Sequence, residues 1–208
     1  MLIKREVFYF EKAGEQNTDN VIESVKERVK QGDLTYVVVA SNSGKTALKL
    51  AEALRDMKVK IICVTESPQR LDLEAQWPIL TKENRKRLKE LGIVIVENIP
   101  YASFCSVLDN NRWQTPSPNT LVYMTLRTVG GAGLKVAMEV MFMAVWAGVL
   151  PPGENTISIG GTISGADTAI VVRSAFQENF FASEVKKRPM VLEILAMPRE
   201  KTWQDEPF

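Results

Sequence analysis

Histidine is absent from the 208-residue chain, and cysteine occurs only twice. Histidine is the side chain that most often serves as a general base and as a transition-metal ligand. Its absence excludes Ser-His-Asp catalysis, Cys-His catalysis and histidine-ligated zinc. Two cysteines are also too few for the usual thiolate zinc sites, so that only carboxylate and carbonyl ligation of a hard cation such as magnesium stays open.

A surplus of charge of either sign is missing too, because 26 Lys and Arg residues are balanced by 25 Asp and Glu residues. We therefore expect no nucleic-acid partner and no membrane partner, and any anion site must be local. The most apolar run, residues 134–150, is shorter than the roughly 20 residues of a membrane span and contains Lys135 and Glu139, which predicts a buried core helix. The start of the chain has no signal-peptide pattern and Cys63 lies in an apolar run, so we expect a cytoplasmic protein.

Apolar runs alternate with amphipathic segments along the chain. Helices are expected at 20–32, 44–57, 82–91, 121–129 and 134–150, and strands at 5–12, 35–41, 59–65, 93–98, 156–161, 167–174 and 189–198. Unbroken β-branched runs on both sides of a helix are typical of parallel strands that are covered on both faces. We predict a single domain over residues 1–208, an α/β three-layer α/β/α sandwich whose mostly parallel sheet has an antiparallel edge strand.

A turn with the sequence Ser-Asn-Ser-Gly-Lys-Thr, residues 41–46, connects the strand at 35–41 to the helix after it. A triphosphate-binding loop needs another glycine five positions before Gly44. That position is Val39, inside the predicted strand, so the full pattern is absent. A shorter cradle for a single phosphate remains open.

The residue types of this turn suit such a cradle. Ser41, Asn42 and Ser43 offer hydroxyl and amide donors, and the following helix directs its free N–H groups to the same point. Alternatively, a serine only caps the helix, and Lys45 and Thr46 lie on a solvated first turn. Ligands of open α/β sheets gather at the carboxyl ends of strands, which favours the phosphate cradle.

Two further glycine-rich turns, at 128–135 and 158–168, are expected to converge on the same crevice. The segment 128–135 matches the glycine pattern of dinucleotide-binding proteins poorly, because its third glycine is not at the required spacing. An equally good interpretation of it is a tight helix entry against a neighbouring element. The candidate lining residues from these turns are Gly130, Gly131, Gly160, Gly161 and Thr162.

The segments VVVASNSGKTALKLAEALRDMKVKIICVTES and TISIGGTISGADTAIVV together resemble the C-terminal α/β domain of pyruvate kinase, in order, over most of residues 18–175. In pyruvate kinases the corresponding turn receives a phosphate of a sugar-bisphosphate activator, so the resemblance implies a phosphate role for residues 41–46. The catalytic barrel of those enzymes has no counterpart here. The resemblance therefore implies a regulatory-type module without pyruvate kinase activity.

The whole chain is also similar to a group of stand-alone archaeal and bacterial proteins of this fold, which have no assigned reaction and are associated with flavin mononucleotide (FMN). This resemblance makes FMN the leading candidate for a phosphorylated ligand. Its phosphate would lie on the 41–46 turn, and Thr65, Glu66 and the glycine turns would line the sugar and ring. Because a flavin carries its own redox chemistry, an oxidoreductase does not require histidine.

Two other functions compete with this hypothesis. One is a non-catalytic regulatory module that senses a sugar phosphate or nucleotide by changing its assembly, which the resemblance to an allosteric domain and the tail with Trp203 and Phe208 suggest. We expect a homo-oligomer in either case. The other is magnesium-dependent phosphoryl transfer with Glu66 or Asp167 as metal ligand, although a loop cap and a turn-forming role explain these two residues better.

The irregular segment 98–119 has the length of a functional loop, and we interpret it as a candidate lid. Trp77, Tyr101 and Trp113 lie in irregular segments and have rings suited to stacking on a planar ligand, although anchoring of the loops explains them better. Cys105 has no histidine or basic neighbour to lower its pKa, so we predict an unreactive thiol.

Overall fold

The structure is a computed structural model, and it describes residues 2–66, 80–97, 99 and 117–201. The predictions for Trp77, Tyr101, Cys105, Trp113 and the tail therefore lie outside the described residues, as does most of the candidate lid.

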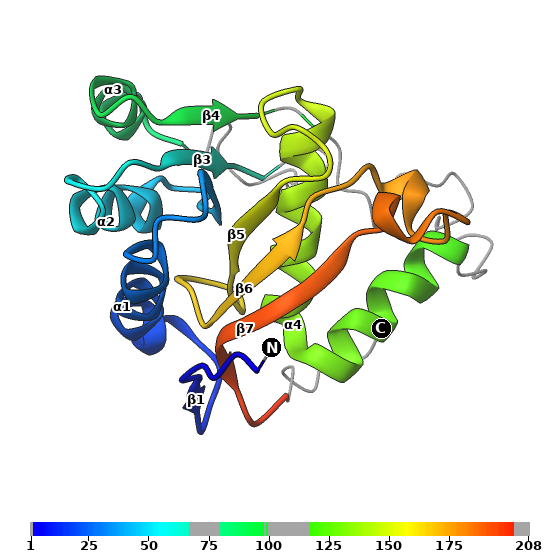
Figure 1. Cartoon of the computed structure of the whole chain (residues 1–208). Helices are drawn as coiled ribbons and strands as arrows, with labels where there is room; N and C mark the ends of the chain where they lie inside the picture. Colours follow the sequence, from blue (N-terminus) through cyan, green and yellow to red (C-terminus); the bar gives the residue numbers. More distant parts are fainter. Residues whose placement is uncertain (1, 67–79, 98, 100–116, 202–208) are drawn as a thin grey trace, which may run out of the picture.

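Strands of the described chain form one seven-stranded sheet, in the order β1-β7-β6-β5-β2-β3-β4 (Figure 1). Their bounds are β1 (Phe8–Phe10), β2 (Tyr36–Ala40), β3 (Lys60–Val64), β4 (Val94–Val96), β5 (Asn155–Gly160), β6 (Thr168–Arg173) and β7 (Met190–Pro198). Pairing is parallel except between β6 and its two neighbours, β5 and β7. The sheet is thus mostly parallel, with its antiparallel part toward the β1 edge.

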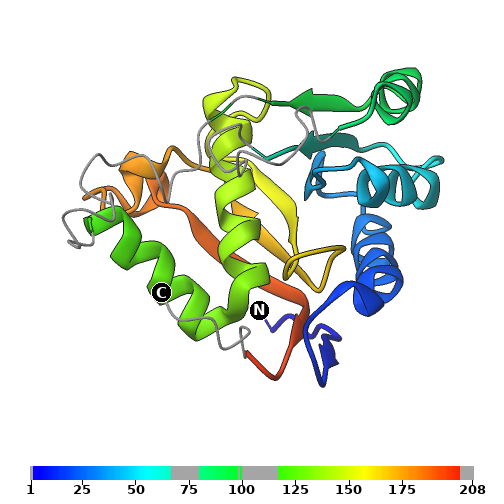
Figure 2. The ribbon, with the colours of Figure 1, turned by 180° about the vertical axis from the view of Figure 1, so that it is seen from behind.

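The helices cover both faces of this sheet (Figures 1 and 2). On one face lie α1 (Thr18–Val29), α2 (Lys45–Ala53) and α3 (Lys82–Glu90), and on the other lies α4 (Pro118–Trp146). Successive residues of a strand point to opposite faces. Val37 and Val39 accordingly pack in the core beneath α1 and α2, and Val38 packs in the core beneath α4. These two apolar cores confirm the predicted three-layer α/β/α arrangement.

Helix α4 bends at Gly131, whose φ of +86° and ψ of 168° are not helical. The bend divides α4 into a first arm, residues 118–130, and a second arm, residues 132–146. Both the predicted helix at 121–129 and the predicted glycine turn before the core helix are therefore confirmed. The helix is long and apolar enough to cross a membrane by composition, but 78% of its most apolar window is buried, as in the core helix of a folded domain.

Capping side chains define where two of the helices begin. Thr81 accepts a hydrogen bond from the Asn84 N–H at the start of α3, and Ser117 accepts one from the Thr120 N–H at the start of α4. Pro118 then occupies the first helical position, where its missing N–H costs nothing. Among the short 3₁₀ helices, η5 (Gln177–Asn179) lies close to the start of α4, since the Tyr123 hydroxyl bonds Gln177.

Candidate functional site

The 41–46 turn lies where the sequence placed it, at the carboxyl end of β2. Register aligns Ala40 with Val64 of β3 and Val39 with Ile159 of β5. Residues Thr65 and Glu66 therefore follow the strand on one side of the turn, and Gly160, Gly161 and Thr162 end or follow the strand on its other side. The candidate residues that follow β2, β3 and β5 are brought to one edge of the sheet, above the start of α2.

Both serines of the turn cap α2. Ser41, which is buried, accepts a hydrogen bond at its Oγ from the Ala47 N–H (3.3 Å), and the Ser43 Oγ accepts one from the Lys45 N–H (3.4 Å). The Lys45 side chain is exposed. Within the described part of the chain, no hydrogen bond engages the side chain of Lys45 or Thr46. The serines therefore cap the helix as the alternative interpretation predicts, but the solvated first turn is found only for Lys45, because the Thr46 side chain is buried.

Gly44 is required by the fold at this position. Its φ of +83° is left-handed, and a Cβ atom added to it would lie 2.8 Å from Leu80 Cδ1 and 3.3 Å from Asn84 Cβ. The α carbon thus faces α3. Close approach of a phosphate was the predicted role of this glycine, but its conformation and packing explain it without a ligand.

Asn42 and Glu66 bind each other. The Asn42 Nδ2 donates to the Glu66 Oε2 at 2.6 Å, and the Glu66 N–H donates to the Asn42 Oδ1 at 2.8 Å. From the other side, the Asn84 Nδ2 donates to the Ser43 carbonyl at 2.7 Å. The turn is thus tied to both the β3 end and α3, and the Asn42 amide, predicted as a phosphate donor, is engaged with a carboxylate.

Thr65 continues the pairing of β3 with β4. Its N–H donates to the Val96 carbonyl at 3.0 Å, its hydroxyl donates to the same oxygen at 3.4 Å, and its side chain is buried. In this conformation the hydroxyl faces the protein backbone. Among the predicted residues after β3, Glu66 is the one with partial exposure.

The glycine turns of α4 and β5 pack tightly against each other. A Cβ atom on Gly160 would lie 2.2 Å from the Gly133 carbonyl oxygen and 2.6 Å from the Ala137 nitrogen. One on Gly161 would lie 2.4 Å from the Gly165 oxygen, which closes the β5–β6 hairpin. This close approach is the tight helix entry that the sequence offered as the second interpretation.

Gly130 and Gly131 serve the same helix entry. A Cβ atom on Gly130 would overlap the Leu134 side chain, and Gly131 makes the bend of α4. Gly133 was not among the predicted site residues, but it tolerates a side chain no better than Gly130 does. A Cβ on Gly133 would lie 2.3 Å from the Asp167 Oδ1 and 2.2 Å from the Thr168 Oγ1. The run of glycines was visible in the sequence, but these partners are distant in the chain.

Asp167 is fully buried and organises the loops at this edge. Its Oδ2 accepts hydrogen bonds from the Gly14 N–H (3.0 Å) and the Thr162 N–H (3.1 Å), and its Oδ1 accepts one from the Thr168 hydroxyl (2.9 Å). Both carboxylates proposed as magnesium ligands thus have protein partners. The described residues contain no group of three or more side chains suited to a metal ion.

Cys63 lies beneath the 41–46 turn and contacts the backbone of the turn, since the Cys63 Sγ donates to the Ser41 carbonyl at 3.6 Å. Burial, with a smaller contribution from the charge of Glu97, raises the pKa of this thiol to about 12. Cys63 is therefore protonated at neutral pH and supports the turn as an apolar neighbour. Its position beneath the turn depends on the pairing of β2 with β3, which the sequence pattern does not contain.

No family model matches the chain.

Proposed function

We propose that this protein binds a phosphorylated small molecule on the 41–46 turn, with FMN as the leading candidate. The observation that supports the proposal best is the exposed Lys45 side chain at the start of α2, which follows the carboxyl end of the interior strand β2. Hydrogen bonds to a charged group contribute about 1.5–3 kcal/mol each, and the helix dipole contributes about 0.3–1 kcal/mol. The donors of the turn should thus dominate the affinity.

The donor set suits one phosphate group. The groups that would hold it are the Ser43 hydroxyl, the Lys45 ammonium, and the hydroxyl and N–H of Thr46. The Lys45 and Ala47 N–H groups already bond Ser43 and Ser41. The Glu66 carboxylate is held beside the turn by Asn42, and a second phosphate would add unfavourable charge next to it. We therefore infer a phosphate monoester as the ligand, which agrees with FMN and disfavours a nucleoside triphosphate.

The choice of FMN derives from the sequence resemblance, which also favours a module without pyruvate kinase activity. When bound, a flavin supplies electron-transfer chemistry of its own. The residues of this chain would bind its phosphate and orient its sugar and ring at the carboxyl edge. The proposed function therefore extends to oxidoreductase activity with the bound flavin.

A comparison of FMN with riboflavin tests the proposal, because the two ligands differ only in the phosphate. Calorimetric titration should give an FMN affinity at least tenfold above that for riboflavin. Lys45→Ala should lower FMN affinity about three- to tenfold. This loss is smaller than the full value of a hydrogen bond to a charged group, because solvent screens the exposed Lys45 ammonium. Lys58→Ala, an exposed lysine before β3 at the opposite edge, is the matched control and should bind like wild type.

Equal binding of FMN and riboflavin, or an equal loss in both lysine variants, would contradict the assignment of the phosphate to this turn.

A second candidate function is assembly control by a phosphorylated ligand. Met190, Val191 and Leu192 at the start of β7 are exposed, and β1 pairs only with the later residues Ala196–Pro198. An apolar strand edge of this kind is suited to pairing with a second copy of the chain. Sedimentation velocity should then show a phosphate-dependent change in mass, and Val191→Lys should abolish it. An unchanged monomer under all conditions would exclude this function.

A further inference from the structure

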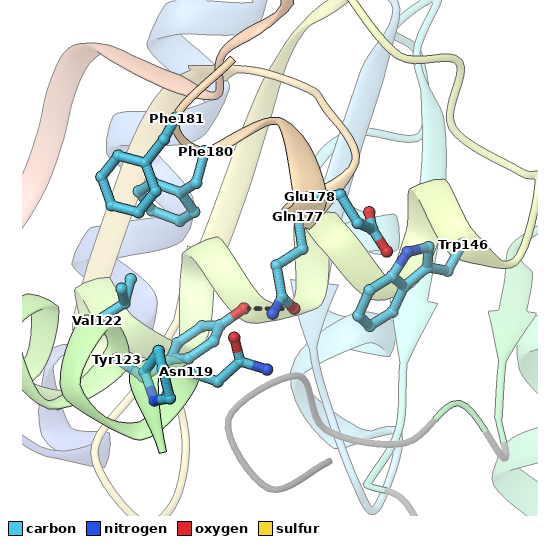
Figure 3. A pocket seen from close by; sticks show the side chains of 9 residues that line it. Asn119, Val122, Tyr123, Trp146, Gln177, Glu178, Phe180 and Phe181 are labelled. Atoms are coloured by element: carbon cyan, nitrogen blue, oxygen red, sulfur yellow. Dashed lines mark hydrogen bonds between the residues drawn. The ribbon is translucent and has the colours of Figure 1, made fainter. Parts of the chain in front are cut away.

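A pocket of about 450 Å³ lies far from the 41–46 turn, between the two arms of α4 and the segment around η5 (Figure 3). Pro118 and Trp146, at opposite ends of the bent helix, both line it. The second arm runs from the carboxyl edge of the sheet, where Gly133 meets Gly160, to the amino edge. The pocket is thus at the amino end of the parallel strands, and the 41–46 turn is at their carboxyl end.

Aromatic rings from three segments form much of the pocket wall. Tyr123 comes from the first arm, Trp146 ends the second arm, and Phe180 and Phe181 follow η5 (Figure 3). Phe180 packs against Phe142 of the core, with ring centroids 5.7 Å apart, and against Phe181 at 5.8 Å. Ring faces of this kind bind planar apolar groups.

Tyr123 is held in place from two directions. Its hydroxyl donates to the Gln177 Oε1 at 3.1 Å, and the Lys135 ammonium lies 5.9 Å from its ring centroid. Lys135 in turn forms an ion pair with the buried Glu139 at 2.6 Å, so its charge is neutralised inside the protein. Tyr123 is therefore already in a fixed position, so less conformational entropy is lost when a ligand binds in the pocket.

The described lining contains few polar groups, and one of them carries a negative charge. Asn119, Gln177 and Glu178 line it together with the aromatic residues. Glu178 is the single ionisable acid or base among these lining residues apart from the tyrosine, and none of them is a lysine or arginine. Aromatic faces attract cations through their quadrupole, and the carboxylate adds to this attraction.

We propose that this pocket is a second binding site, for a small planar aromatic molecule that is neutral or positively charged. The accessible rings of Trp146, Phe180 and Phe181 would stack on the ligand, with the buried Tyr123 supporting the wall behind them. Glu178 and the two amides would accept hydrogen bonds from a donor on the edge of the ligand. Anionic ligands are disfavoured, because the described residues of the lining include no lysine or arginine. The site is independent of the phosphate turn in position and in the charge that it selects.

Three probes of nearly the same shape test the charge selection: benzamidine is cationic, benzamide is neutral and benzoate is anionic. Binding to the full-length protein is measured by saturation-transfer NMR and by chemical-shift titration. Benzamidine should bind most tightly and benzoate most weakly. Glu178→Gln should reduce the preference for benzamidine over benzamide by roughly two- to fivefold, the size expected for an exposed charge pair.

A pair of neighbouring substitutions tests the location. Val122→Phe places a ring into the pocket and should reduce benzamidine affinity at least fivefold. Leu121→Phe adds the same ring at an exposed position one residue earlier, outside the lining, and should leave affinity unchanged. The proposal is overturned if benzoate binds as well as benzamidine, if both variants bind equally, or if none of the three probes binds the wild-type protein. Circular dichroism of each variant shows whether it is folded.

Discussion

Asn42 and Glu66 form a reciprocal pair, in which the amide of Asn42 donates to the carboxylate and accepts from the Glu66 N–H. The pair joins the ends of β2 and β3, two neighbouring strands in the centre of the parallel sheet. It gives the 41–46 turn a fixed shape and also keeps a negative charge beside it. In our account this charge limits the turn to a ligand with one phosphate.

Removing that charge should therefore strengthen phosphate binding. Glu66→Gln keeps the backbone donor to Asn42 and a similar side-chain shape, so we expect FMN affinity to rise about two- to fivefold and riboflavin affinity to stay constant. Glu52→Gln, which removes an exposed carboxylate near the end of α2, is the control. A Glu66→Gln variant that binds FMN no better than Glu52→Gln would show that the carboxylate does not act on the ligand.

Gly44 should be sensitive to substitution for reasons of folding. Gly44→Ala combines a positive φ with a Cβ contact of 2.8 Å, whereas Gly32→Ala has a similar φ of +75° and open space around the Cβ. Urea denaturation should show that Gly44→Ala lowers the free energy of unfolding by about 1–3 kcal/mol more than Gly32→Ala does. Equal losses in the two variants would mean that α3 yields to the added methyl group.

Cys63 should be unreactive in the folded protein. Its pKa of about 12, against an ordinary 9.0, reduces the thiolate population at pH 8 by about a thousandfold. In a Cys105→Ser variant, Cys63 is the remaining thiol. We expect iodoacetamide to label it negligibly in buffer and completely in about 6 M guanidinium, a concentration above the usual unfolding midpoint. Rapid labelling in buffer would contradict the burial of this thiol beneath the turn.

Stability in acid should depend on Glu193. Burial raises the pKa of Glu193, but its hydrogen bonds with Arg28 and the charge of Arg28 outweigh burial and hold the pKa below 4.5. The stability it contributes is therefore present above pH 4.5 and is lost as the pH falls through the folded-state pKa. Glu193→Gln should lower the free energy of unfolding by about 1–3 kcal/mol at pH 7 and much less at pH 2.

Glu90→Gln, whose carboxylate is 3.8 Å from the exposed Lys86, should change stability little at either pH. A Glu193→Gln loss that is the same at pH 7 and pH 2 would show that the ion pairs with Arg28 and Arg5 do not account for it.

The layer arrangement and the place of the 41–46 turn could be predicted from the sequence, because both depend on local patterns. Unbroken runs such as Val37–Val39 predict buried parallel strands, and ligand-binding turns follow such strands. The bend at Gly131 was also visible, since a glycine pair separates two helical patterns.

The internal partners of the turn could not be predicted in this way. Asn42 lies 24 residues from Glu66 in the chain, and Gly14 lies 153 residues from Asp167. These contacts between distant residues determine which donors of the turn are already hydrogen-bonded within the protein. A short sequence motif holds no information about them. The same holds for the pocket between the arms of α4, whose Tyr123 and Gln177 are 54 residues apart.

Binding of a phosphate monoester to the 41–46 turn, with FMN as the first candidate, can be measured on the purified protein itself. We would record the absorbance spectrum and the native mass spectrum of protein purified without added ligand, and repeat both after incubation with FMN. We expect a flavin absorbance band with a mass increase of one FMN per chain, and a weaker band in Lys45→Ala. A colourless protein that gains no mass from added FMN would contradict this proposal.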